Sequence, residues 1–331
     1  MCSRQSLIVA IACCMLCSCN RFNPKSSLSF LPDYRHIDVD VESLVPQLYS
    51  DNEYYLYDFN IDDSVLVAYL SEGEHFLLAQ NLNSGDTLSY LCRKGRGPLE
   101  FLLVSPRFSY RDGHAYLVDN MKSRLLDVDV RASIAKGETV ILKTVDLEND
   151  KDRIQHFNMS VRTEDGYLVS YHNNTSFGKE ALDDEPAFQV NDAENGAVLK
   201  SVPLFDNLTS KRLDNMAMPV GGLVSIQGCE IPGSAQICFA MHSLPVIGFF
   251  DYKNGTIRGI YLENLPKFKR NKSISYFSSI TSDGENIYAL LEGSDSPLDS
   301  DTHVTSLIVM DIIGNINGYY TPIQVNSATR V

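Results

Sequence analysis

The chain has 331 residues, a formal net charge of −14 and 44% hydrophobic residues. This length suffices for one large domain or two ordinary ones, and the hydrophobic content suffices for a packed core, which excludes a disordered chain. The acidic balance excludes nucleic acid as a partner, because binding to a phosphate backbone needs clustered Lys and Arg.

The N-terminal segment has the pattern of an export signal. Arg4 is the only charged residue before position 21, and the apolar stretch LIVAIACCML follows at residues 7–16. The stretch is too short for a spanning helix, which needs about 20 apolar residues. Its end, LCSC at residues 16–19, resembles the lipobox of bacterial lipoproteins. That resemblance implies removal of residues 1–18 and acylation of Cys19; the alternative is an ordinary secretory peptide that is cut nearby.

The residues after Cys19 refine the expected location. Asn20 stands where an Asp would, by resemblance to enterobacterial lipoproteins, favour retention at the inner membrane. Residues 20–27 also lack the acidic run that resembles a surface-export signal of Bacteroidetes lipoproteins. We therefore expect the outer membrane facing the periplasm, in preference to the cell surface, with the lipid as the only membrane contact. The expected organisation is a lipidated tether at residues 19–34 and a single domain at residues 35–331.

From about Tyr54 onward, short β-type runs alternate with Gly, Asn and Asp, and no window of a dozen residues has helical periodicity. The pattern predicts an all-β chain. Two series of turns recur along it. The first series is Asp62-Asp63, Asp112-Gly113, Asp165-Gly166 and Asp283-Gly284. The second series has glycines at positions 85, 137, 196, 255 and 314, of which the last four are 59 residues apart. Four antiparallel strands in each such unit are the blade of a β-propeller, although common turn residues can also recur by chance.

The stretch LCRKGRGPLEF at residues 91–101 combines two glycines with three cations. It is not a P-loop, because the Gly-Lys-Ser/Thr ending is missing, and it is not a dinucleotide fingerprint, because Glu100 takes the place of the last glycine. We interpret it as a structural turn, with positive φ angles at Gly95 and Gly97 and a buried Phe101. The alternative is an anion-binding loop that is lined by Arg93, Lys94 and Arg96.

A family resemblance rests on this same stretch. Its pattern G-x-G-P-x-E-F is formed by Gly95, Gly97, Pro98, Glu100 and Phe101. It resembles the TolB-like six-bladed β-propeller lipoproteins of Bacteroidetes, although Leu99 stands where that family often has a glycine. Residues 113–130 likewise resemble the inner hairpin of NHL-type and TolB-type propellers.

The resemblance implies that the stretch connects adjacent blades and that the propeller has six blades of four antiparallel strands. Five units can be recognised in the sequence. The sixth is expected from residues 207–223, or from the N-terminal RHIDVDV (residues 35–41) pairing with the C-terminal strands, which would close the ring.

The mature part of the chain keeps three cysteines, of which two lie in GCEIPGSAQIC. If Gly233-Ser234 is a two-residue hairpin turn, Cys229 and Cys238 face each other at a non-hydrogen-bonded position. The pair is then either a cross-strand disulfide or two small buried hydrophobes.

Other candidates for chemistry are weak. The seven histidines are scattered, and only His172 and His242 lie at strand ends that can reach a face of the propeller. The run GSDSPLDSDTH at residues 293–303 carries three aspartates suitable for calcium, but it lacks the glycine and glutamate of an EF-hand, so an exposed acidic loop is the better interpretation. The sequence predicts no cofactor and no metal, and without CxxC motifs it predicts no zinc site.

These observations predict a lipid-anchored scaffold that binds a protein or small ligand of unknown identity and is not an enzyme. A purely structural subunit of an envelope complex is a further alternative. The rival function is a lyase or hydrolase, acting for example on glycans, with a site at the mouth of the central channel. A compact cluster of charged residues at that mouth would favour the enzyme, and an exposed apolar patch would favour a protein partner.

Overall fold

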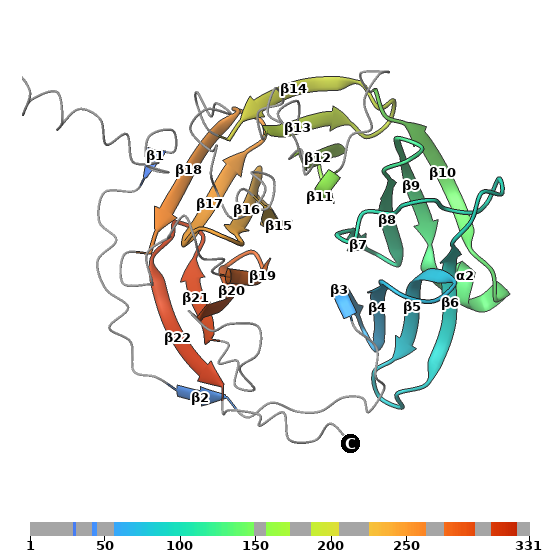
Figure 1. Ribbon diagram of the computed structural model, residues 1–331, viewed down its shortest axis with the longest axis horizontal. Helices are drawn as coiled ribbons and strands as arrows, with labels where there is room; N and C mark the ends of the chain where they lie inside the picture. The colour runs from blue at the N-terminus through green and yellow to red at the C-terminus, as the bar shows by residue number, and fades with distance from the viewer. Residues whose placement is uncertain are drawn as a thin grey trace, which may run out of the picture.

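The structure is a computed structural model, and it describes residues 29–30, 42–44, 56–148, 157–172, 187–204, 225–262, 275–294 and 306–322. The expected lipidation site Cys19 and the acidic loop around residues 295–301 lie outside these ranges. Within them, the chain forms five antiparallel sheets that are arranged around a common axis as a β-propeller (Figure 1).

Each sheet is a meander of four consecutive strands, so the five sheets are the blades of the propeller. The first blade contains β3 (Leu56–Asp62), β4 (Val65–Leu70), β5 (His75–Asn81) and β6 (Thr87–Arg93). The second contains β7 (Ser109–Arg111), β8 (His114–Asp119), β9 (Arg124–Asp129) and β10 (Val140–Asp146). The third contains β11 (Phe157–Arg162), β12 (Tyr167–His172), β13 (Ala187–Asp192) and β14 (Val198–Pro203).

The last two blades follow the same pattern. The fourth contains β15 (Ile226–Glu230), β16 (Gln236–Met241), β17 (Val246–Asp251) and β18 (Thr256–Tyr261). The fifth contains β19 (Ser275–Ser282), β20 (Asn286–Ser294), β21 (Ser306–Asp311) and β22 (Ile316–Pro322). The first strand of each blade lies innermost in the ring, and successive blades contact each other through these inner strands from the first blade to the fifth (Figure 1).

The expected count of six blades is wrong for the described residues, which form five. Two N-terminal segments do pair with later strands, but neither builds a blade of its own. β1 (Ser29–Phe30) lies parallel to β18, and β2 (Glu42–Leu44) lies parallel to β22. Each therefore adds a fifth strand to the outer edge of an existing sheet. Residues 207–223 lie outside the described ranges.

Every blade has two ends with different roles. The turns between its first and second strands and between its third and fourth strands lie at one end, which we call the turn end. The connections between its second and third strands, and those that lead to the next blade, lie at the other, which we call the connection end. Both repeated turn series are therefore at the turn end, and their glycines have positive φ angles: Gly85, Gly113, Gly137, Gly166, Gly196, Gly255, Gly284 and Gly314.

Within the described residues, one helix interrupts the predicted all-β chain. α2 (Val130–Lys136) joins β9 to β10 in place of a plain turn. The Asp129 carboxylate caps its first turn by accepting from the Ala132 N–H at 2.7 Å, and Gly137, in the left-handed conformation, ends it. At seven residues the helix is too short to show a periodic pattern, which is why the sequence gives no sign of it. No helix within the described ranges is long and apolar enough to cross a membrane.

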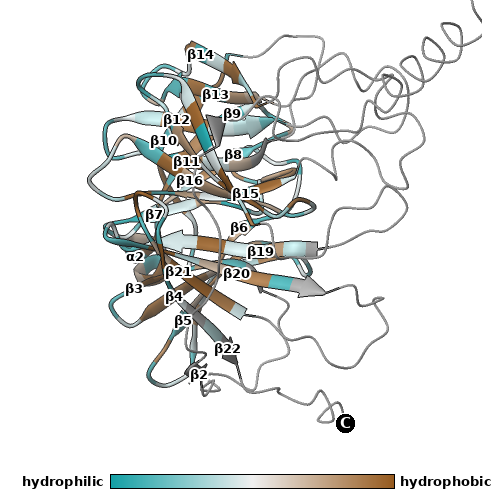
Figure 2. Cartoon of the chain, turned by 90° about the vertical axis from the view of Figure 1, so that its left-hand side faces the viewer, coloured by the Kyte–Doolittle hydropathy of each residue, from teal (hydrophilic) through white to brown (hydrophobic). Residues whose placement is uncertain are grey.

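The hydrophobic core lies between neighbouring blades. One cluster joins the third and fourth blades, where Phe188 stacks on Phe250 at 4.4 Å between ring centroids. A second joins the fourth and fifth blades, and a third joins the first and second. Figure 2 shows hydrophobic residues in the body of the strands and hydrophilic residues frequent in the turns along its left-hand edge. Middle strands such as β4, β5, β13 and β17 are buried over nearly their whole length, so both faces of these sheets are covered and the two ends of the ring are left for binding.

Candidate functional sites at the two ends of the ring

The turn end carries an ion pair between the second and fourth blades. Arg111, the last residue of β7, places Nη2 2.6 Å from Oε2 of Glu230, the last residue of β15. The other carboxylate oxygen accepts the Glu164 N–H at 3.0 Å. The Glu230 side chain is only 8% exposed. Burial raises its pKa, against the opposing effects of the Glu164 N–H and Arg111.

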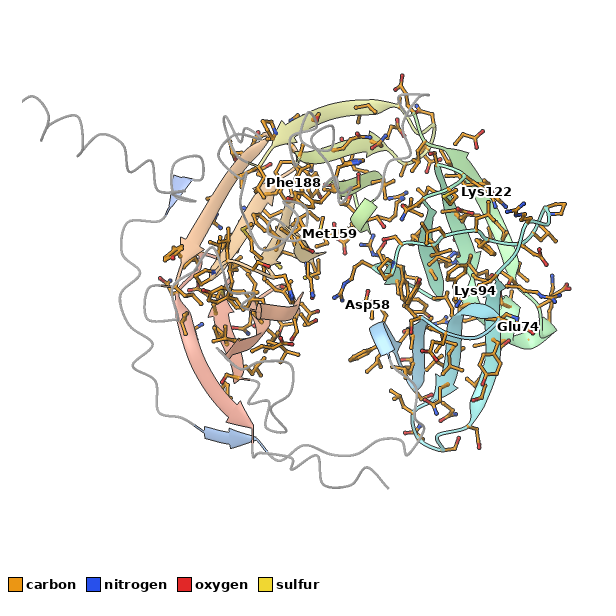
Figure 3. All side chains as sticks on the ribbon, in the orientation of Figure 1. Asp58, Glu74, Lys94, Lys122, Met159 and Phe188 are labelled. Carbon is orange, nitrogen blue, oxygen red and sulfur yellow. The ribbon has the colours of Figure 1, made fainter. Side chains whose placement is uncertain are left out.

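A second ion pair joins the first and second blades at the inner edge of the ring. Nη1 of Arg107 lies 3.1 Å from Oδ1 of Asp58 on β3. Burial raises the pKa of Asp58, and the neighbouring Arg107 partly opposes this rise. Figure 3 shows Asp58 at the inner edge of the ring. The first pair therefore joins the inner strands of two blades, and the second joins the inner strand β3 to the connection that leads into β7.

Further charges at the turn end are also paired across blades. Glu194 of the third blade pairs with Lys143 of the second and lies 3.6 Å from Arg162. Asp165 pairs with Lys253 of the fourth blade at 2.6 Å. These ion pairs connect one blade to another. A group that bound substrate there would have to displace one of them.

The connection end contains the stretch at residues 93–101, between β6 and β7. The Gly97 N–H donates to Oε2 of Glu100 at 2.8 Å, and Arg93 Nε lies 3.9 Å from Oε1. The loop closes through backbone bonds between Gly95 and Phe101 and between Phe101 and Arg93. Phe101 is fully buried against the core of the first two blades, whereas Pro98 is exposed.

The two glycines are needed for space and not for their φ angles. Neither Gly95 nor Gly97 has a positive φ, contrary to the expectation. A Cβ atom on Gly95 would lie 2.0 Å from the Glu100 carboxylate, and one on Gly97 would lie 3.0 Å from it. The loop therefore folds around its own carboxylate, which takes the place that a bound anion would need. Lys94 also turns away, because its Nζ donates to the Ser71 carbonyl at 3.0 Å.

Four exposed apolar side chains gather beside this loop. We call them the Leu99 patch; they are Leu99, Leu102, Leu103 and Met121. Leu99 is 70% exposed and Met121 is 46% exposed. Three of them follow Pro98 in the connection between blades, and Met121 lies in the turn between β8 and β9. Apolar side chains exposed together at the end of a ring are a typical interaction surface.

One buried carboxylate holds the two loops of the patch together. Oδ1 of Asp119 accepts the N–H groups of Met121 and Lys122 at 3.2 Å each, and Oδ2 accepts the Leu102 N–H at 3.4 Å. The Asn120 N–H also donates to the Leu103 carbonyl at 2.8 Å. Asp119 is completely buried. The patch is therefore fixed in position and does not depend on free loops.

The loops that carry the patch are rich in cationic residues. Residues 93–104 and 119–124 hold five cations and two carboxylates, in a chain whose net charge is −14. Lys122 is fixed by donation from Nζ to the Glu100 carbonyl at 2.6 Å, and the Arg93 and Arg96 side chains are exposed. Figure 3 shows Lys94 and Lys122 toward the periphery of the ring, far from Asp58.

The two cysteines of the fourth blade are direct neighbours. Cys229 on β15 is the register partner of Cys238 on β16, and their Sγ atoms lie 3.3 Å apart as free thiols. The third described cysteine, Cys92, is buried elsewhere, on β6.

The two candidate histidines lie at the connection end, and each already has a polar neighbour within hydrogen-bond distance. His172 Nε2 lies 3.2 Å from the Ser170 hydroxyl, and His242 Nδ1 lies 3.1 Å from the Phe277 carbonyl. The described residues contain no group of three His, Cys, Asp or Glu that could hold a metal ion.

The sequence did not predict the inter-blade ion pairs or the Leu99 patch. Arg111 and Glu230 are 119 residues apart, and no local pattern links them. The patch does have a local signal, because the segment PLEFLL after the turn contains four apolar residues besides its proline, and they cannot all face the core.

No family model and no curated protein matches the sequence. Solved structures match it weakly. A Bacteroides fragilis protein described as exported has 13% identity and a TM-score of 0.48, over 88% of this chain and 78% of that one. The chain in the nidogen/laminin complex has 15% identity and a TM-score of 0.44, over 78% and 76%. The computationally designed Ika8 protein has 12% identity and a TM-score of 0.41, over 89% and 87%. Such similarities carry no inference about ligand, partner or compartment, and the β-propeller fold is established by the chain's own sheets.

Proposed function

We propose that the chain is a lipid-anchored envelope protein whose β-propeller is a scaffold that binds another protein through the Leu99 patch. The observation that carries this proposal is the exposure of four apolar side chains on loops that a buried Asp119 holds in place. A fixed apolar surface loses little conformational entropy on binding, so contact with a partner is favourable. The cationic surroundings fit a partner whose contact surface combines apolar side chains with carboxylates.

The anchor is part of the same proposal and is supported by the N-terminal sequence. Acylation of Cys19 would hold the ring at the outer membrane on the periplasmic side. A single tether leaves the propeller free to orient toward a partner. Six blades, as in the TolB-like lipoproteins that the connection loop resembles, are not needed for this function, because both loops of the patch belong to the first two blades and their connection.

The enzyme alternative would need a charged group at the channel mouth that a substrate can reach. The Glu230 side chain is only 8% exposed and pairs with Arg111 at the turn end, and Asp58 pairs with Arg107 at the inner edge of the ring. This pairing supports binding over catalysis as the role of the described residues.

Site-specific photo-cross-linking tests the binding surface. A photoreactive amino acid replaces Leu99 in the full chain, which is expressed in its own host and irradiated in intact cells. The matched control carries it at Ile313, which is 61% exposed at the turn end. We expect one discrete cross-linked product from position 99 that position 313 does not give. The charge reversal Arg96→Glu should reduce the amount of this product. Equal products from both positions, or none from either, would contradict the proposal.

Metabolic labelling with a clickable fatty acid tests the anchor. The wild-type chain should take up the label, Cys19→Ala should lose it, and Cys17→Ala should keep it. An unlabelled wild-type chain would refute the lipid anchor without affecting the cross-linking result.

A further inference from the structure

The inner hairpin of the fourth blade places two thiols where they can be joined. The register pairs Cys229 with Cys238, and the Sγ–Sγ distance is 3.3 Å, which is van der Waals contact. Adjacent strands in such a pair bring their Cα atoms to about 5.5 Å, which lies within the range that a disulfide spans. Forming the bond requires the two sulfur atoms to approach from 3.3 Å to about 2.05 Å.

The hydrogen-bonding phase of this hairpin differs from the one that the sequence predicts. A two-residue turn would put the pair at a non-hydrogen-bonded position. Instead, the Ile231 N–H donates to the Gln236 carbonyl, and the His242 N–H donates to the Ser225 carbonyl. Counting by two from either contact places Cys229 and Cys238 at a hydrogen-bonded position, because four residues form the loop. The direct opposition of the two cysteines is nevertheless kept.

We infer that Cys229 and Cys238 are a covalent modification site, at which exchange with a disulfide oxidant forms an intrachain disulfide across the inner edge of the fourth blade. Use of the site in the cell rests on the proposed export, because disulfides persist in oxidising compartments. The bond would fix the strand that ends at Glu230, and so would hold one half of the ion pair with Arg111.

The two sulfur atoms have different access. Cys229 is partly exposed, whereas Cys238 is buried. The Cys229 thiolate therefore attacks one sulfur of the oxidant R–S–S–R, forming a mixed disulfide and releasing one R–S⁻, which takes up a proton. Cys238 then loses its proton and attacks the Cys229 sulfur, releasing the second R–S⁻, which is protonated in turn. The two cysteines lose two electrons and two protons, and the oxidant becomes two R–SH.

The surroundings of Cys229 set the rate of the first step. Its neighbour Cys238, burial and the charge of Asp58 on β3 raise its pKa well above the ordinary value, while the Thr281 hydroxyl on β19 opposes the rise. The thiolate is therefore scarce at neutral pH. We expect the exchange rate to rise about tenfold for each pH unit between pH 7 and 8.

Peptide mapping by mass spectrometry tests the site in the purified full chain. The chain is incubated with oxidised glutathione, its remaining thiols are alkylated, and it is digested without reduction. We expect a peptide pair linked between Cys229 and Cys238 that is lighter by two hydrogen atoms, with Cys92 alkylated. Cys92→Ser should form the same link. Both cysteines alkylated, or a stable glutathione adduct on Cys229, would overturn the inference.

Thiol trapping in cells separates this inference from the proposed function. Cells that express the full chain are quenched with acid and alkylated before lysis, and the fatty-acid label is read in the same sample. A labelled chain with the Cys229–Cys238 link supports both proposals. A labelled chain without the link overturns the disulfide and leaves the anchor standing. An unlabelled chain that still forms the link with glutathione in the tube refutes the anchor and supports the site.

Discussion

The turn end and the connection end of the ring differ in what their side chains are paired with. At the turn end, Arg111, Glu230, Asp165 and Glu194 each have an opposite charge on another blade. At the connection end, the Leu99 patch is held by a buried carboxylate, and its apolar side chains point to solvent. Groups that hold the fold are already satisfied, whereas groups that remain exposed on fixed loops are available to a partner.

The connection loop should contain one residue that holds the fold, Phe101, and one that is available to a partner, Leu99. Phe101→Ala removes a fully buried ring and should lower the free energy of unfolding by about 3–5 kcal/mol, measured by denaturant titration. Leu99→Ala, two residues earlier, should change it by less than about 0.5 kcal/mol, because Leu99 is mostly exposed. A large loss of stability in Leu99→Ala would mean that the patch is part of the core and would contradict its role as a surface available to a partner.

The ion pair between the second and fourth blades should be structural. Arg111→Ala leaves the buried Glu230 carboxylate without its cation and should cost about 2 kcal/mol of unfolding free energy at neutral pH. The loss of Arg111 removes an effect that lowers the pKa of Glu230, so the folded-state pKa rises further above the ordinary 4.5. The loss of unfolding free energy in Arg111→Ala is therefore present at pH values above that raised pKa. It disappears as the pH falls below 4.5, where Glu230 is protonated in both the folded and the unfolded state.

Thermal unfolding of wild type and Arg111→Ala at pH 4 and pH 7.5 measures this effect. The two midpoints should converge at the lower pH. A difference that stays constant with pH would show that the guanidinium acts by packing alone.

The glycine in the connection loop should be required by the carboxylate next to it. Gly95→Ala puts a methyl group against the Glu100 carboxylate, which has to move and lose its hydrogen bond with the Gly97 N–H, so the change should cost about 1 kcal/mol. The double variant Gly95→Ala/Glu100→Ala should lose less stability than the sum of the two single changes, because removing the carboxylate removes the clash. Strict additivity in denaturant titrations would disprove the steric explanation.

The outermost ion pair at the turn end should matter least. Lys143→Ala removes the partner of the exposed Glu194 and should change the unfolding free energy by less than about 1 kcal/mol, falling further at high salt. If Lys143→Ala lowered the unfolding free energy as much as Arg111→Ala, burial would not be the property that decides how much each inter-blade ion pair stabilises the fold.

Features with a local cause could be predicted from the sequence, and features that depend on distant segments could not. The glycines at Gly113 and Gly166 mark tight turns because the backbone there needs positive φ, and the structure has both. The opposition of Cys229 and Cys238 follows from a single hairpin. Its hydrogen-bonding phase does not, because it depends on whether the loop has two residues or four.

Three other features could not be predicted from the sequence, each for a different physical reason. The helix α2 has clear caps at Asp129 and Gly137, but its seven residues show no periodicity. The contact of Arg111 with Glu230 depends on the angle between blades. The count of six blades came from a resemblance, whereas the N-terminal segments of this chain join the outer edges of sheets that already have four strands.

The parallel strands β1 and β2 have a consequence for the order of folding. Ser29 pairs with Arg258, and Glu42 pairs with Tyr320, so β1 and β2 bind strands that are synthesised long after them. Contacts of such high sequence separation form late, after the loop-closure entropy has been overcome. The blades between them can form in turn while the polypeptide is still growing. β1 and β2 therefore stay undocked until β18 and β22 have been synthesised, and until then they are accessible to other cellular machinery.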